Sequence, residues 1–204
     1  MSIERLQILA EEPSMEVALR SLLPKMLGDL PFDLITFQGK PDLLKKLPER
    51  LRGYAKWLPS TWRILILVDR DDDDCHELKR RLEQLAKEAG LVTRSADRKN
   101  WNVVNRLAIE ELEAWYFGDW EAVREAYPKA GATITSKKRY RDPDRIKGGT
   151  KEAFERVMQR AGYFIGGLRQ TEAAQSIARH MVPERNRAKS FQVLRETLEE
   201  LIVR

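Results

Sequence analysis

Residues 63–69 read RILILVD, and this apolar run constrains the fold more than any other segment of the chain. No polar side chain lies between Arg63 and Asp69, so a strand formed here is buried on both of its faces. Strands of this kind belong to parallel sheets, because the crossover connections of a parallel sheet cover both sides with helices. The run therefore predicts an α/β fold.

The segments on either side of this run alternate between strand and helix signals. Further strands are predicted at residues 5–11, 32–38 and 102–108, with a short one at 91–94. Helices are predicted from Pro13, from Pro41 and over residues 75–89, with a kink or a restart at Pro48. Strand–helix units of this length form right-handed crossovers, so we expect a mostly parallel sheet with helices on both faces.

The pattern changes in the last third of the chain. A basic stretch, KKRYRDPDR, covers residues 137–145, and three helices are predicted after it, over residues 150–161, 171–181 and 190–203. We therefore expect residues 1–128 to form the α/β domain. Residues 129–204 are expected to form a basic linker and a C-terminal helical appendage packed on that domain.

Composition narrows the class of protein. No apolar run approaches the roughly 18 residues of a membrane span, and the first residues lack the layout of a signal peptide. The single cysteine, Cys75, cannot form an internal disulfide, and with His76 and His180 it supplies too few ligands for a structural zinc site. These features lead us to expect a cytoplasmic protein without a membrane partner.

The net charge of +5 and the pI near 9.3 make the protein mildly basic. This balance fits a nucleic-acid or other polyanionic partner, and it equally fits an ordinary charged surface. The distribution is more informative than the sum, since acidic residues concentrate at 69–74 and basic residues in the second half of the chain.

Acidic residues end two of the predicted strands. Glu11 and Glu12 follow the first strand, and Asp69 and Asp71 follow the run at 63–69. Ligands of open α/β sheets bind beyond the carboxyl ends of the strands, so these side chains converge if the two strands are neighbours. Converging carboxylates must shift their pKa values or bind a cation, and oxygen-only ligands favour Mg²⁺ or Mn²⁺.

The aspartates of the DRDDDD run are expected to divide between two roles. Asp69 and Asp71, two positions apart on an extended segment, point the same way and can share one ion. Residues 72–74 are expected to open the next helix, where negative charge meets the positive end of the helix dipole. An acidic helix start without any ion is the alternative for the whole run.

Two known classes of D-x-D site fit the run poorly. An EF-hand loop needs Gly at its sixth position and Glu at its twelfth, and Asp74 and Arg80 stand there. Haloacid-dehalogenase-type phosphatases place a nucleophilic Asp near the start of the fold and have Gly and Thr after the D-x-D. Neither feature is present here.

A glutamate after the first strand together with D-x-D after the third resembles the Toprim domain of topoisomerases, primases and overcoming-lysogenization-defect nucleases. The resemblance is carried by LAEEPSME and ILVDRDDDDC. The chain more closely resembles a bacterial family of Toprim-like domains of unknown function (the one numbered 4276). The matching segments are FQGKPDLLKKLPERLRGYA, VDRDDDDCHELK, NRLAIEELEAWYFGDWEAV and SFQVLRETL, which together cover nearly the whole chain.

The resemblance implies a set of site residues. The Toprim glutamate falls on Glu11 and the two aspartates on Asp69 and Asp71, all as catalytic residues and metal ligands. In the family a Gly usually follows the glutamate, but here Glu12 follows, so the choice between Glu11 and Glu12 stays open. Such nucleases recruit further carboxylates for a second metal, which makes Glu111 and Glu113 candidates. A solvated helix face is the alternative for this pair.

The function that the resemblance implies is metal-dependent hydrolysis of phosphodiester bonds in nucleic acid, with DNA expected before RNA. Mg²⁺ or Mn²⁺ would be the cofactor, and a partner ATPase in phage defence is expected. Basic side chains would hold the nucleic-acid backbone, namely Lys40, Lys137, Lys138, Arg139 and Arg141. For Lys40 an exposed loop lysine is the alternative. A non-catalytic module that binds nucleic acid or an ATPase, and a small-molecule phosphatase, stay open as alternative functions.

Overall fold

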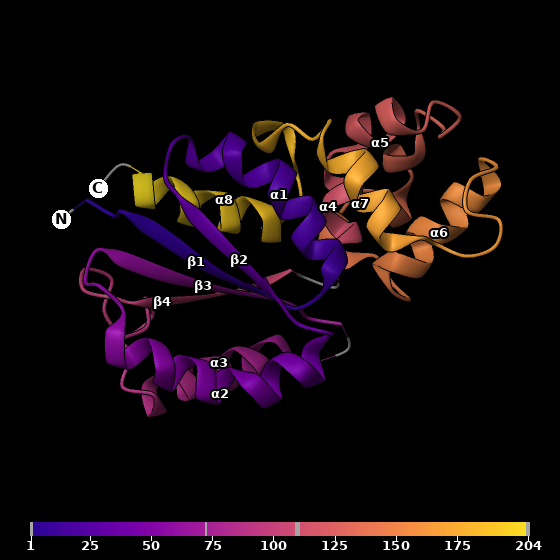
Figure 1. Cartoon of the computed structure of the whole chain (residues 1–204). Coiled ribbons are helices and arrows are strands. Elements are labelled where there is room, and N and C mark those ends of the chain that lie inside the picture. The colour runs from indigo at the N-terminus through magenta and orange to yellow at the C-terminus, as the bar shows by residue number, and fades with distance from the viewer. Residues whose placement is uncertain (1, 72, 109–110, 203–204) are drawn as a thin grey trace.

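The computed structural model describes residues 2–71, 73–108 and 111–202. Its sheet contains β1 (Arg5–Ala10), β2 (Phe32–Thr36), β3 (Trp62–Asp69) and β4 (Val103–Ala108). The strand order is β2-β1-β3-β4, and every neighbouring pair is parallel. The expected α/β fold is therefore confirmed, with an all-parallel sheet flanked by helices (Figure 1).

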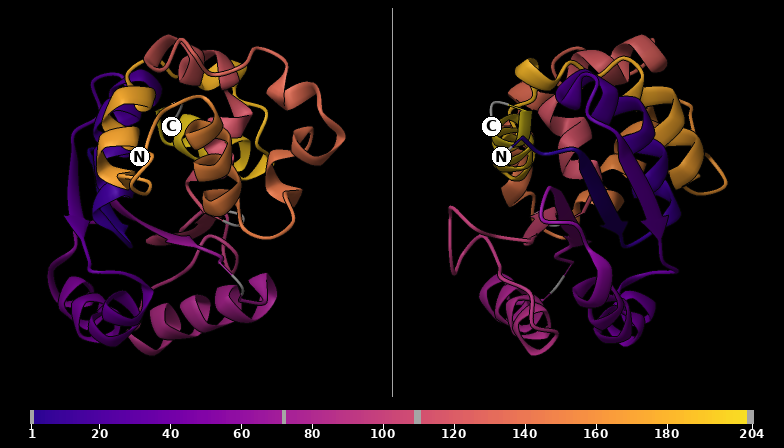
Figure 2. Two further views of the ribbon diagram at one scale, coloured as in Figure 1. Left: turned by 90° about the vertical axis from the view of Figure 1, so that its right-hand side faces the viewer. Right: turned by 60° about the vertical axis from the view of Figure 1, so that its left-hand side comes forward.

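Helices cover both faces of this sheet. Helices α1 (Pro13–Leu27) and α8 (Lys189–Ile202) lie on one face, and α2 (Lys40–Trp57) and α3 (Cys75–Glu88) lie on the other (Figures 1 and 2). The central strand β3 explains the arrangement: Leu65 and Leu67 join the core beneath α1, while its alternate residues join the core beneath α2 and α3. The double burial predicted from RILILVD is thus realised.

The connections change direction between β1 and β3. The chain leaves β1 through α1 toward β2 on one side, and it leaves β3 through α3 toward β4 on the other. Neighbouring strands whose connections diverge in this way form the topological switch point of an open α/β sheet. A ligand crevice is therefore expected where β1 and β3 end.

Residues after β4 form mostly short helices beyond the carboxyl ends of the strands (Figure 1). They are α4 (Glu113–Gly118), α5 (Trp120–Ala126), α6 (Thr150–Arg160) and α7 (Gln170–Ala178), with 3-10 turns at Ile134–Ser136, Lys138–Tyr140, Pro143–Arg145 and Pro183–Arg185. Helix α7 packs on α1, and α8 packs on α1 and β4. These helices share one apolar core with β1 and α1, and the expected division at residue 128 stays a prediction.

Two local expectations were wrong. Residues 91–94 do not form a strand: Thr93 makes a single bridge to Val103, because the chain turns at once and the Ala96 N–H donates back to the Thr93 carbonyl. Helix α2 also does not restart at Pro48 but runs on through it, and a kink there stays a prediction. Among the described residues, no helix is both long enough and apolar enough to cross a membrane.

Candidate functional site

Glu11 and Asp69 meet at the switch point of the sheet. Glu11 follows the last residue of β1, Asp69 is the last residue of β3, and both side chains are buried. The Asp69 backbone N–H donates a hydrogen bond of 2.8 Å to Glu11 Oε2. The structure therefore brings together the two acids that the sequence placed at neighbouring strand ends.

Asp69 is the least satisfied carboxylate at this point. Its Oδ1 atom is buried and has no hydrogen-bond partner within the described residues. Burial raises the pKa of Asp69 well above its usual value, and the charges of Glu11 and Glu12 raise it further. A buried carboxylate without a partner is costly, so this oxygen is an open position for a proton or a cation.

Glu113 presents a second such oxygen. It is the first residue of α4, is 1% exposed, and has an Oε2 atom without a hydrogen-bond partner in the described part of the chain. Burial, followed by the charge of Glu111, raises the pKa of Glu113 from 4.5 to about 8. The charge of Glu113 also raises the pKa of Asp69, so the two carboxylates interact. We call Glu11, Asp69 and Glu113 the crevice acids, after the crevice expected at the switch point.

Sequence reasoning missed Tyr116, which lies one turn after Glu113 on α4. Its hydroxyl is buried and has no hydrogen-bond partner among the residues described. Burial raises the pKa of Tyr116 well above 10, and the charges of Glu113, Glu12 and Asp69 add to the shift. The three-residue spacing in EAWY was the available signal, since it places Glu113 and Tyr116 on one side of a helix.

Glu11 and Glu12 differ in their surroundings. Glu11 is 6% exposed, and burial raises its pKa from 4.5 to about 7, partly offset by the hydrogen bond from Asp69. Glu12 is only partly buried, precedes α1, and accepts a hydrogen bond from the Ser14 hydroxyl. Of the two, Glu11 is therefore the one that contacts Asp69.

Asp71 does not share the direction of Asp69. Its φ angle is 50°, so the backbone leaves the extended conformation on which the expected pairing of Asp69 and Asp71 rested. The Asp71 side chain is 46% exposed, and its carboxylate lies 2.8 Å from the Lys40 ammonium group. Asp71 therefore pairs with Lys40, and its charge also raises the pKa values of Asp69 and Glu11. Its role as a metal ligand stays a prediction.

Lys40 is held within this acidic loop. Its ammonium group lies 2.8 Å from Asp71, 2.6 Å from Asp73 and 2.9 Å from the Arg70 carbonyl oxygen. Burial acts to lower the pKa of Lys40, but the hydrogen bonds to Asp71 and Asp73 outweigh it and the pKa rises. With a side chain 12% exposed, Lys40 is not an exposed loop lysine, and its contact with a phosphate stays a prediction.

Asp74, the last aspartate of the run, begins helix α3, as expected. Asp74 is the N-cap, and its Oδ1 atom accepts hydrogen bonds of 2.9 Å from the backbone N–H groups of His76 and Glu77. These bonds, the one from Glu77 first, lower the pKa of Asp74. Asp73 pairs with Lys40, and Asp72 lies outside the described residues.

Glu111 has a structural partner that Glu113 lacks. Its Oε2 atom accepts hydrogen bonds of 3.1 Å from the Thr150 hydroxyl and 2.8 Å from the Lys151 N–H, at the start of α6. Burial raises the pKa of Glu111, and these bonds oppose the rise. Glu111 therefore joins α6 to the loop before α4, while Glu113 keeps a free oxygen beside the crevice.

The donor chemistry of the crevice suits a hard divalent cation. Glu11, Asp69 and Glu113 offer carboxylate oxygens only, and Asp69 and Glu113 each keep a buried oxygen that a cation would satisfy. Within the described ranges, no group of three or more His, Cys, Asp or Glu side chains is arranged closely enough to hold a metal ion. Binding would therefore draw these side chains together.

The predicted nucleic-acid contacts lie on short turns between α5 and α6. Lys137, Lys138, Arg139 and Arg141 are all exposed there. Tyr140, between them, is 2% exposed and stacks on Phe117, with ring centroids 5.2 Å apart. It supports the turn from within and does not present its ring to solvent.

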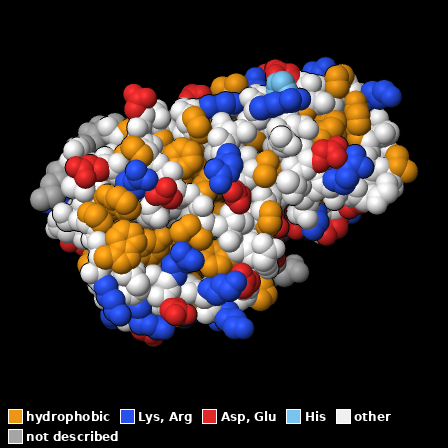
Figure 3. Space-filling view, in the orientation of Figure 1, with side chains coloured by type: hydrophobic (Ala, Val, Ile, Leu, Met, Phe, Trp, Pro, Cys, Tyr) orange, Lys and Arg blue, Asp and Glu red, His pale blue; other side chains and the backbone are white. Residues whose placement is uncertain are grey.

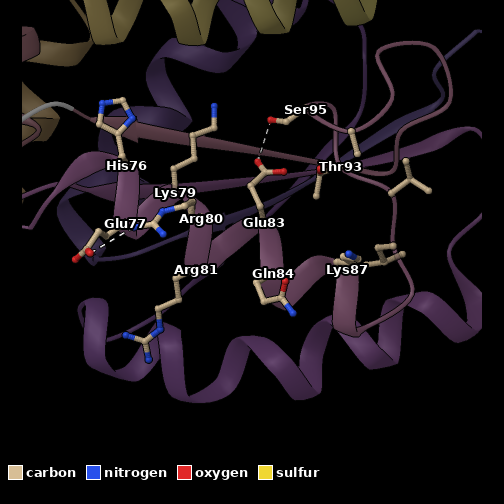
Figure 4. A pocket seen from close by; sticks show the side chains of 13 residues that line it. His76, Glu77, Lys79, Arg80, Arg81, Glu83, Gln84, Lys87, Thr93 and Ser95 are labelled. Atoms are coloured by element: carbon tan, nitrogen blue, oxygen red, sulfur yellow. Dashed lines mark hydrogen bonds and ion pairs between the residues drawn. The ribbon is translucent and has the colours of Figure 1, made fainter.

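A hollow of about 1090 Å³ lies away from the crevice acids. It runs along the outer side of α3 and residues 91–96, beneath the basic side chains Lys79, Arg80, Arg81 and Lys87 (Figure 4). None of the buried crevice acids lines it. Figure 3 shows acidic and basic side chains interspersed over one face, with basic side chains gathered along its lower edge, over α2.

Comparison with known proteins gives one match. The model of a family described as a domain of unknown function (DUF4276) matches residues 10–199 of the chain. No curated protein and no solved structure matches it.

Proposed function

The chain belongs to the DUF4276 family, and we propose that it is a metal-dependent nuclease that hydrolyses phosphodiester bonds of nucleic acid. One observation carries the proposal. Asp69 and Glu113 are buried carboxylates that each keep an oxygen without a hydrogen-bond partner in the described structure. The charge of Glu113 raises the pKa of Asp69, and the Asp69 N–H donates a hydrogen bond to Glu11 at the switch point of the sheet.

The same contacts indicate which acids would hold the ion. Asp71 and Asp73 already share the ammonium group of Lys40, so their charge is largely compensated. Asp69 and Glu113 each keep a buried oxygen without a hydrogen-bond partner in the described structure, and Glu11 feels the charge of Lys40, which lowers its pKa. Mg²⁺ or Mn²⁺ would therefore be held by Asp69, Glu113 and Glu11, and Asp71 would stay with Lys40 unless the loop rearranges.

A divalent ion bound there would activate water and offset the charge that develops on the phosphate. The chain itself supplies proton transfer and positioning. The pKa of Glu11, raised by burial to about 7, lets this side chain accept a proton near neutral pH. The buried hydroxyl of Tyr116 is a hydrogen-bond donor beside Glu113. Lys40 keeps the loop of Asp71 and Asp73 in place.

Nucleic acid is the proposed substrate because the exposed basic turns lie beside α4, the helix that begins with Glu113. We also propose a relation to the Toprim domain, supported by a glutamate after β1 and D-x-D after β3 on neighbouring parallel strands. DNA as the preferred substrate and a partner ATPase in phage defence belong to the same proposal.

A second candidate is a non-catalytic module that binds nucleic acid or an ATPase. One observation favours it: the crevice acids of the described chain are not gathered into a ready metal site. A module of this kind would use the exposed basic residues and would keep the acids as a folding or regulatory feature.

The test is cleavage of plasmid, single-stranded DNA and RNA with Mg²⁺ or Mn²⁺. We expect cleavage by the wild-type protein, loss of cleavage in Asp69→Asn and Glu113→Gln, and retention in the control Asp73→Asn. Calorimetry with Mn²⁺ accompanies it. Intact nucleic acid together with no measurable Mn²⁺ binding would refute the nuclease and favour the module. Release of phosphate from monoesters, without cleavage of nucleic acid, would indicate a phosphatase.

A further inference from the structure

A second, basic hollow of about 500 Å³ lies against α6. Its lining includes Lys138, Arg139, Arg145 and Lys147 from the segment between α5 and α6, and Arg156 from α6 itself. We infer that this basic pocket binds phosphate groups of the nucleic-acid strand whose scissile bond lies at the acidic crevice. The inference rests on the proposed nuclease function and adds the path of its substrate.

The charge of the basic pocket is poorly compensated. Asp142 is its only acidic lining residue; it pairs with Arg145 at 3.6 Å and accepts a hydrogen bond from the Asp144 N–H. Asp144 turns away to α8, where its Oδ1 atom accepts a hydrogen bond of 2.6 Å from the Ser190 hydroxyl.

The remaining cations of the pocket make no ion pair with any described residue; they are Lys138, Arg139, Lys147 and Arg156. All four are exposed, so water can reach them and a ligand can replace it. Lysine and arginine are the usual phosphate partners, and arginine can hold a phosphate through two parallel hydrogen bonds.

The pocket is built on the same helices as the crevice. Its inner wall is Tyr140, which stacks on Phe117 at the far end of α4 with an interplanar angle of 16°. Helix α4 begins with Glu113. Its other wall is α6, whose first residues donate hydrogen bonds to Glu111. The basic pocket is therefore attached to α4 and to the loop before it, the segment that also carries Glu113.

The chain limits the distance between the basic pocket and the segment that contacts Glu111. Lys147 lies four residues before Lys151, whose N–H contacts Glu111, so their Cα atoms are at most about 14 Å apart. Phosphates of one strand advance about 3.4 Å along the axis of a duplex. Glu111 stands two residues before Glu113 in the chain. On the proposed path, a strand cut at the crevice would place a phosphate a few nucleotides away in the basic pocket.

The lining does not suit a membrane surface. The apolar residues of the pocket, Tyr140, Ile146 and Ala153, are buried in its floor and cannot enter a lipid layer. Membrane-binding surfaces combine basic residues with exposed apolar ones. A strand of nucleic acid needs only the cations, and about 500 Å³ leaves room for sugar as well as phosphate.

The test measures binding without turnover. Fluorescence anisotropy of labelled single-stranded and duplex DNA, in EDTA, compares wild type with the double variant Lys147→Gln/Arg156→Gln. The control, Arg52→Gln/Lys56→Gln, removes the same charge from exposed positions on α2, across the sheet. For single strands we expect the salt dependence of log K to fall by about 0.7 for each lost contact. Affinity should fall roughly tenfold near 0.1 M salt, and the control should stay within about twofold.

Unchanged affinity and salt dependence in the pocket variant, or an equal loss in the control, would overturn the inference. The inference would also fail if inorganic phosphate bound the pocket of the wild-type protein without lowering its affinity for DNA. The two proposals fail separately. If the wild type cuts DNA but the pocket variant binds as wild type does, only the pocket is wrong. If the pocket variant loses binding but the wild type never cuts, only the nuclease is wrong.

Discussion

Two groups of carboxylates behave in opposite ways, although Asp69 of one group stands only two residues before Asp71 of the other. The loop acids, Asp71, Asp73 and Asp74, are exposed or half exposed, and each has a partner in Lys40 or in the first turn of α3. The crevice acids, Asp69 and Glu113, are buried and each keeps an oxygen without a partner in the described chain. The loop acids are the more conspicuous group in the sequence, but they say less about where a cation would bind.

The physical reason lies in solvation. An exposed carboxylate is stabilised by water, so a dense run of them costs little and needs no ligand. A buried carboxylate loses that hydration, and its charge must be compensated by a proton, a partner or a metal ion. Unsatisfied burial, more than the number of acids, marks the position where a cation would gain most.

The largest difference between the two groups is expected in metal affinity. Asp69→Asn and Glu113→Gln should each weaken Mn²⁺ binding by about a hundredfold or more, because each removes a charged oxygen of the crevice. Asp73→Asn should change it by less than about threefold, since Asp73 pairs with Lys40. Titration calorimetry measures both, and equal losses in the two groups would show that the loop acids also hold the ion.

The pH dependence of stability separates the groups by sign. Burial raises the pKa of Glu113 to about 8, so the folded protein binds a proton that the unfolded chain releases near pH 4.5. The stability of the metal-free protein should therefore fall as pH rises from about 5 to 8, by an amount on the order of 2 to 4 kcal/mol. Urea unfolding of wild type and Glu113→Gln measures it.

The variant should be more stable than wild type at pH 8 and should show a flatter profile. Asp74 has the opposite sign: hydrogen bonds lower its pKa, so its contribution is present above its unfolded value of 3.8 and is lost as pH falls. A wild-type profile that stays flat between pH 5 and 8 would mean that Glu113 is already compensated by a partner.

Removal of Lys40 should affect mainly the loop acids, because they pair with it directly, while its charge acts more weakly on Glu11. Lys40→Met leaves Asp71 and Asp73 without their shared cation, and we expect a loss of roughly 1 kcal/mol because both carboxylates are about half exposed. Lys40→Arg should retain most of the stability. Urea unfolding in a double-mutant cycle with Asp73→Asn checks the assignment. A full Lys40 effect that persists in the Asp73→Asn background would exclude the pairing as its source.

The smallest effect is expected at the helix start. Asp74→Ala removes the cap of α3, and Tm should fall by roughly 2 to 4 °C, while Asp74→Ser, which can also cap, should restore most of it. Thermal unfolding followed by circular dichroism measures the difference. If the serine variant were as unstable as the alanine variant, charge and not capping would be the contribution of Asp74.

Much of the fold was predictable because it depends on local pattern. The apolar run at 63–69 predicted a strand buried on both faces, and apolar spacing located most of the helices. Residues 91–94 resembled a strand but form a single bridge, because strand pairing depends on a neighbour that the sequence does not name. The run of aspartates did not indicate that Asp71 and Asp73 pair with Lys40, because Lys40 lies on a distant segment of the chain.

Glu111 and Glu113 illustrate the limit most directly. They stand two positions apart in the same acidic segment. Glu111 accepts hydrogen bonds from the start of α6, whereas Glu113 keeps a buried oxygen without a partner in the described chain. Nothing local distinguishes them. Tyr116 and the basic pocket became visible only once helices from distant parts of the chain were packed together.

By itself, the sequence determined the α/β class, the acids at two strand ends and the start of α3. These depend on side-chain periodicity and on capping, which act over a few residues. Only the tertiary structure decided which acids are buried, which acids pair with Lys40, and which cations lie together beside α6. Burial and pairing depend on segments distant in the chain, and only the folded core brings those segments together.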